Sequence, residues 1–241
     1  MPFKRGPAPL VEDATHPFNL EIFNENPNDQ TFVMIADPGT QTVTPSGPAA
    51  QTLAWLVGVI PGKVGSLVSS GCFYWAEDFA LGLGSITQAG AGTFLATVAA
   101  PMANGGTNDV SAGFTGTAGH GAPKVTALSK TSSTKFTMNS DGTVPTAGEQ
   151  SAALVYYAAA WSIGEEAVAG RFSPASAIRY LPNTVATLAP GPAYSVRAGP
   201  SATDAGDVLD PTLVSSAYPV DFAGVPIVRL TYTASNTFVP H

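Results

Sequence analysis

The sequence predicts an all-β protein. The form that fits it best is a two-sheet antiparallel sandwich of the jelly-roll type, with long loops at its ends. Short runs of β-branched and aromatic residues alternate with clusters of glycine and proline along the chain. No stretch keeps a hydrophobic period of 3.6 residues over three turns, and no repeat indicates a propeller or a solenoid. Two segments rich in loop-forming residues, 101–123 and 199–224, supply the long end loops.

Residues 153–163 form an uncharged stretch. A run this apolar cannot have one face exposed to water, so it is either a strand covered on both faces or a buried helix. Its alanines favour a helix, whereas Val155, the tyrosine pair and Trp161 favour a strand. A helix would lack a clear start, since the approach offers only Ser151 as a cap. We therefore expect a central strand.

Before this stretch the sequence predicts an extended N-terminal arm and then short strands. Residues 1–30 are rich in proline and asparagine and form the arm; residues 31–241 form a single β-sandwich domain. Asp37-Pro38-Gly39 and Pro61-Gly62 are expected to end strands, because proline fixes φ and glycine permits positive φ. The strands expected here are 20–23 (within the arm), 31–36, 52–60, 66–69, 72–76, 79–83, 85–87 and 93–99.

The second half of the chain has the same character. Residues 124–128 and 134–138 predict an antiparallel pair, followed by a turn at residues 139–142. The clearest strand of the whole chain is 226–233, because β-branched and aromatic residues dominate it. The other strands expected here are 167–171, 177–181, 184–188 and 194–197.

The chain carries few charges for its length. Only 11% of its 241 residues are charged, against about 25% in typical soluble domains. A monomer normally stays dispersed through a densely charged surface. We therefore expect much of this surface to be covered by copies of the chain or by other partners.

The charge balance also bears on partners. The net charge of −7 argues against a protein that binds nucleic acid by neutralising phosphates, so any such contact should be indirect or weak. Lys124, Lys130 and Lys135 share one polar segment, which is expected to be a solvated loop face. The apolar run 53–60 is too short to span a bilayer, and no apolar signal segment follows the N-terminus, so no membrane association is expected.

Cysteine and histidine offer little chemistry. The single cysteine, Cys72, excludes an intramolecular disulfide and a cysteine metal cage, and it is expected to be a small buried hydrophobe. His120 lies between two glycines, which work against the fixed geometry that a general base needs. We expect no catalytic residue, no cofactor and no metal site, and hence no enzyme.

The carboxylates leave one alternative open. Asp204, Asp207 and Asp210 could offer oxygen ligands to calcium, but their spacing does not match a calcium-binding loop, and turn formation is the simpler interpretation. Glu165 and Glu166 would point in opposite directions on a strand, so they cannot act together on one substrate.

Aromatic residues are the remaining candidates. Phe73, Tyr74 and Trp75 could stack on a sugar or a base, yet no Arg, Asn or Asp stands close by in the sequence. Core packing is therefore the expected role.

One segment supports a resemblance to a known family. Residues 162–166, followed by Arg171-Phe172, resemble the Gly-Glu and Arg/Phe stretch of picorna-like virus coat proteins, although the intervening residues 167–170 depart from it. The chain layout also resembles the jelly-roll coat proteins of small icosahedral, positive-strand RNA viruses. Those proteins have an irregular arm, short strands with Pro/Gly-rich loops and a closing strand. In this chain Lys4-Arg5 is followed by acidic residues instead of a basic run.

The resemblance implies a structural capsid subunit that self-assembles into an icosahedral shell. Its partners would be other copies of itself and, in some shells, a second coat protein; its location would be the virion. One alternative is a phage decoration or tail protein, or a surface-binding β-sandwich module. Another is a β-sandwich hydrolase that uses the aspartate cluster or His120.

Overall fold

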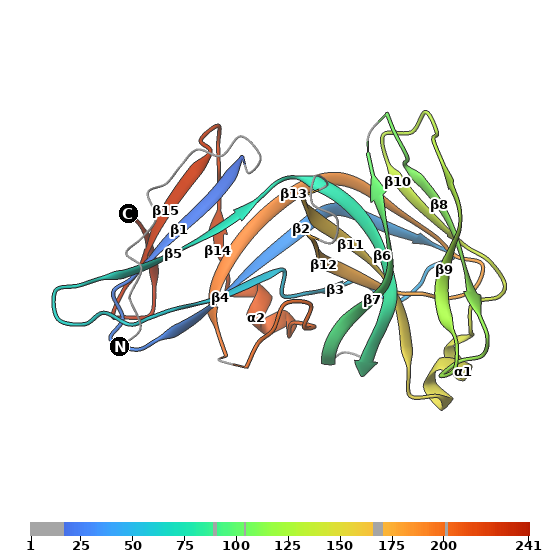
Figure 1. Cartoon of the computed structure of the whole chain (residues 1–241), viewed down its shortest axis with the longest axis horizontal. Coiled ribbons are helices and arrows are strands. Elements are labelled where there is room, and N and C mark those ends of the chain that lie inside the picture. Colours follow the sequence, from blue (N-terminus) through green and yellow to red (C-terminus); the bar gives the residue numbers. More distant parts are fainter. Residues whose placement is uncertain (1–16, 89–90, 104, 166–170, 201) are drawn as a thin grey trace.

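The computed structural model describes residues 17–88, 91–103, 105–165, 171–200 and 202–241, and these residues form three β-sheets (Figure 1). The molecule is elongated, with β1, β5 and β15 at one end and β8, β9 and β10 at the other. The long strands β2 and β13 run between the two ends. The helices of the described residues are short: α1 (Ala147–Ala152) and α2 (Pro211–Ser215).

The first sheet, called sheet A here, joins segments from the two halves of the chain. Its order is β16 (Phe238–Pro240), β15 (Ile227–Tyr232), β1 (Phe18–Asn24) and β5 (Ser69–Trp75). β1 pairs in parallel with β15 and antiparallel with β5. Leu20 and Ile22 have no exposed surface, so β1 is an inner strand with one face in the core.

The second sheet, sheet B, contains the two longest strands. Its order is β4 (Leu56–Ile60), β2 (Gln30–Thr44), β13 (Val185–Gly199), β10 (Phe136–Ser140), β8 (Asp109–Thr115) and β9 (Ala122–Ser129), with β14 (Tyr218–Val220) also on β13. The β2–β13 ladder shifts register between Pro190 and Ala193. Gly39 faces this shift with φ of +129°, and an added Cβ there would lie 2.2 Å from the Ala189 carbonyl oxygen. Only glycine fits this close backbone approach.

The third sheet, sheet C, holds the expected central strand. Its order is β3 (Gln51–Thr52), β12 (Arg171–Arg179), β11 (Tyr156–Glu165), β6 (Asp78–Gln88) and β7 (Ala91–Met102). β11 lies between β12 and β6, and residues 157–164 are buried throughout. The prediction of a strand covered on both faces is thus confirmed for this segment.

Two large apolar cores share the long strands. The first lies around sheet A and includes Tyr194 and Val196 of β13. The second lies around sheet C and includes Ala186 and Leu188 of the same strand. The two ends of the molecule are therefore built on one continuous strand.

Trp55 ties the first core to sheet C. Its side chain is fully buried, and its indole Nε1 donates a hydrogen bond to the Ile163 carbonyl oxygen over 3.0 Å. Its ring packs edge-on against Trp75 and stacks on Tyr194, with centroid distances of 5.3 and 5.5 Å. A buried indole N–H needs such a partner, because an unpaired donor would be costly.

The all-β class and the sandwich-like stacking are confirmed, but the details differ from the two-sheet antiparallel expectation. The described strands form three sheets, and the β1–β15 and β8–β10 pairs are parallel. The jelly-roll form is not confirmed, because eight strands in two sheets define a jelly roll and these sheets have four, seven and five strands.

Several local predictions need correction. The turn expected at residues 37–39 is an irregularity inside β2, and the loop expected at 101–123 contains β8. Strands expected separately at 184–188 and 194–197 are one strand, β13. The expected 124–128/134–138 pair does not form, because β8 lies between β9 and β10 and pairs with both. The segment expected at 199–224 to be loop contains α2 and β14.

The approach to the central strand is also corrected. Residues 147–152 form α1, whose start is Thr146, with a capping box in which the Thr146 hydroxyl and the Glu149 carboxylate each accept a backbone N–H. The Glu149 carboxylate accepts hydrogen bonds from the Thr146 backbone N–H and from the Thr146 hydroxyl, and these two bonds lower the pKa of Glu149. The central strand was expected to start at residue 153, but it starts at Tyr156.

The strand expected at residues 20–23 within the arm exists as β1. It is an inner strand of sheet A, so residues 18–24 belong to the folded domain. Residues 1–16 lie outside the described residues, as do residues 167–170 of the strand expected at 167–171; residue 171 begins β12. Among the residues described, no helix is long and apolar enough to cross a membrane.

Candidate functional site

The Asp204–Asp210 segment is held by hydrogen bonds within the segment and to neighbouring parts of the chain. One Asp207 carboxylate oxygen accepts a hydrogen bond from the Thr93 hydroxyl, and the other accepts from the Asp204 backbone N–H over 2.7 Å. Asp210 caps α2 by accepting from the Thr212 N–H over 2.8 Å, and hydrogen bonds from the Thr212 hydroxyl and N–H lower the pKa of Asp210. Asp207 and Asp210 therefore stabilise local turns, as the simpler interpretation expected, and Asp204 takes part through its backbone.

The other sequence candidates are dispersed. His120 is exposed in the β8–β9 turn, where the neighbouring Gly119 N–H donates to the Tyr157 hydroxyl over 3.0 Å. Glu165 ends β11, while Glu166 lies outside the described residues. Lys124, Lys130 and Lys135 are exposed. Within the part of the chain that the structure describes, no group of three or more His, Cys, Asp or Glu side chains is arranged so that it could hold a metal ion.

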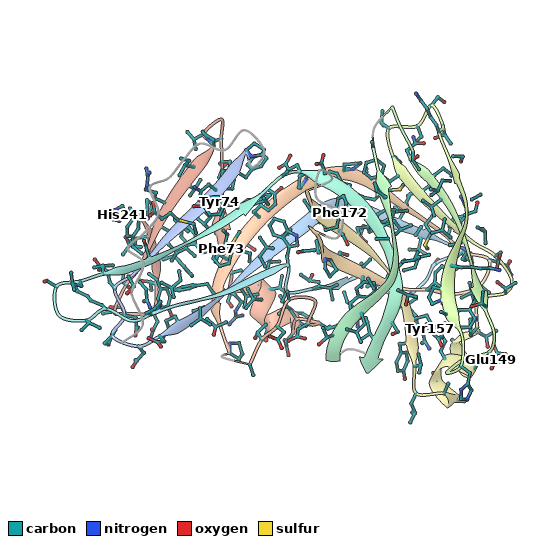
Figure 2. All side chains as sticks on the ribbon, viewed as in Figure 1. Phe73, Tyr74, Glu149, Tyr157, Phe172 and His241 are labelled. Atoms are coloured by element: carbon teal, nitrogen blue, oxygen red, sulfur yellow. The ribbon has the colours of Figure 1, made fainter. Side chains whose placement is uncertain are left out.

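The Phe73-Tyr74-Trp75 triplet follows strand alternation. Phe73 and Trp75 are buried in the first core, whereas Tyr74 is 43% exposed on the opposite face of β5 (Figure 2). A hydrogen bond with the half-buried Cys72 thiol, together with burial, raises the pKa of Tyr74 to about 12. Burial is also the main cause that raises the pKa of Cys72, so this thiol is not an activated nucleophile.

A small pocket of about 160 Å³ lies beside Arg179, at the end of the molecule that carries Tyr157 and Glu149 (Figure 2). The Arg179 guanidinium lies 4.8 Å from the centre of the Tyr156 ring. It donates to the Gln150 side-chain oxygen over 3.2 Å and to the Ala147 carbonyl oxygen over 3.0 Å. Arg179 therefore joins α1 to sheet C, which is a structural role.

A second, more polar pocket of about 390 Å³ lies beside the irregularity of the β2–β13 ladder. Gln41 donates from its amide nitrogen to the Ser176 hydroxyl over 2.8 Å, and its buried Oε1 has no hydrogen-bond partner among the described residues. The polar residues that line this pocket are Asp37, Gln41, Thr52, Ser176 and Ser195.

The most unusual surface is the segment that joins β4 of sheet B to β5 of sheet A and projects at one end of the molecule (Figure 1). The two strands pair with β2 and β1, not with each other, but a bridge between Val64 and Leu67 closes the end of the segment, and we call it the hairpin. Its only charged residue is Lys63. Four aliphatic side chains here face water, and we call them the apolar hairpin tip: Val59 (63% exposed), Val64 (67%), Leu67 (74%) and Val68 (39%).

The tip is held in one shape. Val64 and Leu67 exchange two backbone hydrogen bonds of 3.0 Å across Gly65 and Ser66, and Gly65 has the positive φ of +62° that this turn requires. Because the backbone of this turn is ordered, its aliphatic side chains cannot fold back onto the protein. They therefore stay exposed to water in the isolated chain.

The hairpin base is anchored to residues 24–29. The fully buried Asn24 donates from its amide nitrogen to the carbonyl oxygens of Ile60 and Pro61 over 3.1 and 3.0 Å. Two further hydrogen bonds of 2.8 Å join Lys63 N–H to the Asn26 carbonyl oxygen and Gly62 N–H to the Asp29 carboxylate. This base makes the projection rigid.

A third pocket of about 370 Å³ opens beyond the opposite end of β5, and we call it the aromatic pocket. Its main lining residues are Phe18, Glu77, Pro192, Tyr194, Asp221 and Phe222. The Tyr194 hydroxyl donates to the Glu77 carboxylate over 2.8 Å, and burial followed by this hydrogen bond raises the pKa of Tyr194. Glu77 and Asp221 are exposed, so the apolar floor has an acidic rim.

Comparisons of the chain with protein-family models, with curated proteins and with solved structures found no match.

The apolar hairpin tip was not expected from the sequence. Hydropathy alone makes Val64 and Leu67 look like core residues, and residues 66–69 were expected to be a strand. The available signal was Pro61-Gly62 followed closely by Gly65-Ser66, which frames a short turn between two strands.

Proposed function

We propose that this chain is a structural subunit that assembles with copies of itself into a closed shell, as the capsid subunit of a small icosahedral virus does. In this proposal its place is the virion and its partners are other copies and, in a two-protein shell, a second coat protein. The net charge of −7 leaves direct genome neutralisation to another component.

The apolar hairpin tip is the observation that carries the proposal. Isolated exposed aliphatic residues are common, but a cluster on a rigid projection favours a contact with another protein. The low charge density of the chain supports the same view, because a protein with only 11% charged residues is poorly suited to remaining a monomer at high concentration.

Sedimentation velocity of the purified chain over a range of concentrations, followed by negative-stain imaging, tests the proposal. We expect a concentration-dependent shift to large species and closed particles in the images. A monomer that persists at millimolar concentration would refute it.

The polar pocket favours a second candidate, a surface-binding β-sandwich module such as a phage decoration or tail protein. Hydroxyl and carboxylate groups around an unpaired Gln41 acceptor suit a ligand rich in hydroxyl donors, such as a glycan. This candidate predicts oligomers of fixed low order and binding on a glycan array, with loss of binding in Asp37→Ala.

A further inference from the structure

We propose that the apolar hairpin tip of one copy inserts into the aromatic pocket of a second copy, so that the subunits join head to tail. This inference rests on the proposed self-assembly and specifies the contact that drives it. Three properties of the two surfaces support it: their separation on one molecule, their fit in size and their opposite charges.

The tip cannot occupy the pocket of its own chain. β5 begins at Ser69, next to the tip, and ends at Trp75, two residues before Glu77 at the pocket rim. A strand rises about 3.3 Å per residue, so roughly 25 Å of extended chain separates Ser69 from Glu77. The pocket partner must therefore come from another molecule.

The pocket has the size and surface that the tip needs. A cavity of about 150 Å³ accepts a benzene molecule, so the aromatic pocket, at about 370 Å³, has room for the side chains of Val64 and Leu67. Its floor is formed by Phe18, Tyr194 and Phe222, and the Phe18 and Phe222 rings meet edge to face at 5.2 Å. Aliphatic side chains inserted there would be removed from contact with water.

The charges are complementary. The one charged residue of the hairpin is Lys63, and the pocket rim carries the exposed carboxylates of Glu77 and Asp221. Opposite charges around an apolar contact set the register of docking and reject wrong partners. Two tips brought together would instead place two lysines side by side.

A contact of this kind is heterologous, because two different surfaces of the same chain meet. Heterologous contacts produce a ring when the rotation between subunits closes and an open filament when it does not. A closed ring of subunits is a natural building unit of a shell, which links this contact to the proposed function.

Exchanging the charges tests the docking. Lys63→Glu alone places a carboxylate opposite Asp221, and Asp221→Lys alone places a lysine opposite Lys63. We expect each single variant to require an at least about tenfold higher concentration to assemble, as like charges meet across the contact. Mixing the two variants, or combining both changes in one chain, restores opposite charges and should restore assembly in sedimentation velocity.

Cross-linking locates the contact. In a Cys72→Ser background, which removes the only native cysteine, Leu67→Cys and Ala223→Cys are placed on separate chains and mixed under mild oxidation. We expect a disulfide-linked dimer in the mixture and little in either variant alone. A control mixture of Leu154→Cys, equally exposed at 76% but outside the hairpin, with Ala223→Cys should stay unlinked.

The outcomes separate the inference from the proposed function. If the wild-type chain assembles while the charge variants assemble equally well, or if Leu67→Cys links to itself, the tip–pocket contact is refuted and self-assembly stands. If a glycan or another protein occupies the pocket while the tip stays free, the contact is likewise refuted. A wild-type chain that remains monomeric refutes both.

Discussion

Replacing Asn24 by alanine should loosen the hairpin base and lower the stability of the whole chain. The buried Asn24 amide donates to Ile60, Pro61 and Asn28 carbonyl oxygens over 3.0–3.1 Å and accepts from the Asn26 N–H over 3.0 Å. The two N–H bonds of the amide are shared among three carbonyl oxygens, so the side chain makes about three full hydrogen bonds in all. At about 0.5–1.5 kcal/mol net for each, we expect a loss of about 3 kcal/mol.

The measurement is urea unfolding followed by intrinsic fluorescence, with hydrogen exchange at the Lys63 N–H as a local probe. A loss of about 3 kcal/mol corresponds to a more than hundredfold change in the unfolding equilibrium. Asn28→Ala is the matched control, since Asn28 is exposed and its change should stay within about 0.5 kcal/mol. A loss below about 1 kcal/mol for Asn24→Ala would refute this account of the hairpin base.

Asn24→Asp sharpens the test through its pH dependence. The introduced carboxylate would face the three carbonyl oxygens that the amide now binds, so its folded-state pKa should lie above the unfolded value. The folded state would then bind the proton more tightly than the unfolded state. The deficit in stability should therefore be largest near neutral pH and should shrink as the pH falls through the folded pKa.

Three further predictions concern single positions. Gly39→Ala should lower the free energy of unfolding by about 2 kcal/mol or more, because the added Cβ would lie 2.2 Å from a backbone oxygen and the residue has a positive φ. Gly191→Ala has open space around it and should be nearly neutral. Tyr74 should ionise near pH 12 in an ultraviolet titration and nearer its ordinary value in Cys72→Ser, and wild-type stability should fall between about pH 10 and 12, where the unfolded tyrosine ionises first. Trp55→Phe should lose about 1–3 kcal/mol in urea unfolding, since a buried carbonyl oxygen loses its donor.

The sequence carried enough information for the fold class and for the strands with strong side-chain signals. Residues 226–233 were predicted from their β-branched and aromatic content, and β15 occupies Ile227–Tyr232. The central strand was predicted despite its alanines, because an uncharged run flanked by bulky residues must be buried on both sides. These are local properties that neighbouring residues determine.

Pairing and surface exposure could not be predicted in the same way. β8 was missed because glycine and small residues hide the alternation of its buried Val110, Ala112 and Phe114. Its position between β9 and β10 depends on contacts distant in the sequence. The exposure of Leu67 likewise depends on where β4 and β5 end in space, and no local pattern distinguishes it from a core leucine.

The parallel pairing of β1 with β15 also affects the order in which the chain folds during its synthesis. The Glu21–Arg229 ion pair, 3.0 Å long, joins these strands across 208 residues of sequence. A nascent chain still leaving the ribosome therefore has β5 to pair with β1, but it lacks the second partner, β15, until residues 227–232 have been made. The hydrogen bonds of the hairpin base join residues 24–29 to residues 60–63, so the base can form before β15 closes the other side of β1.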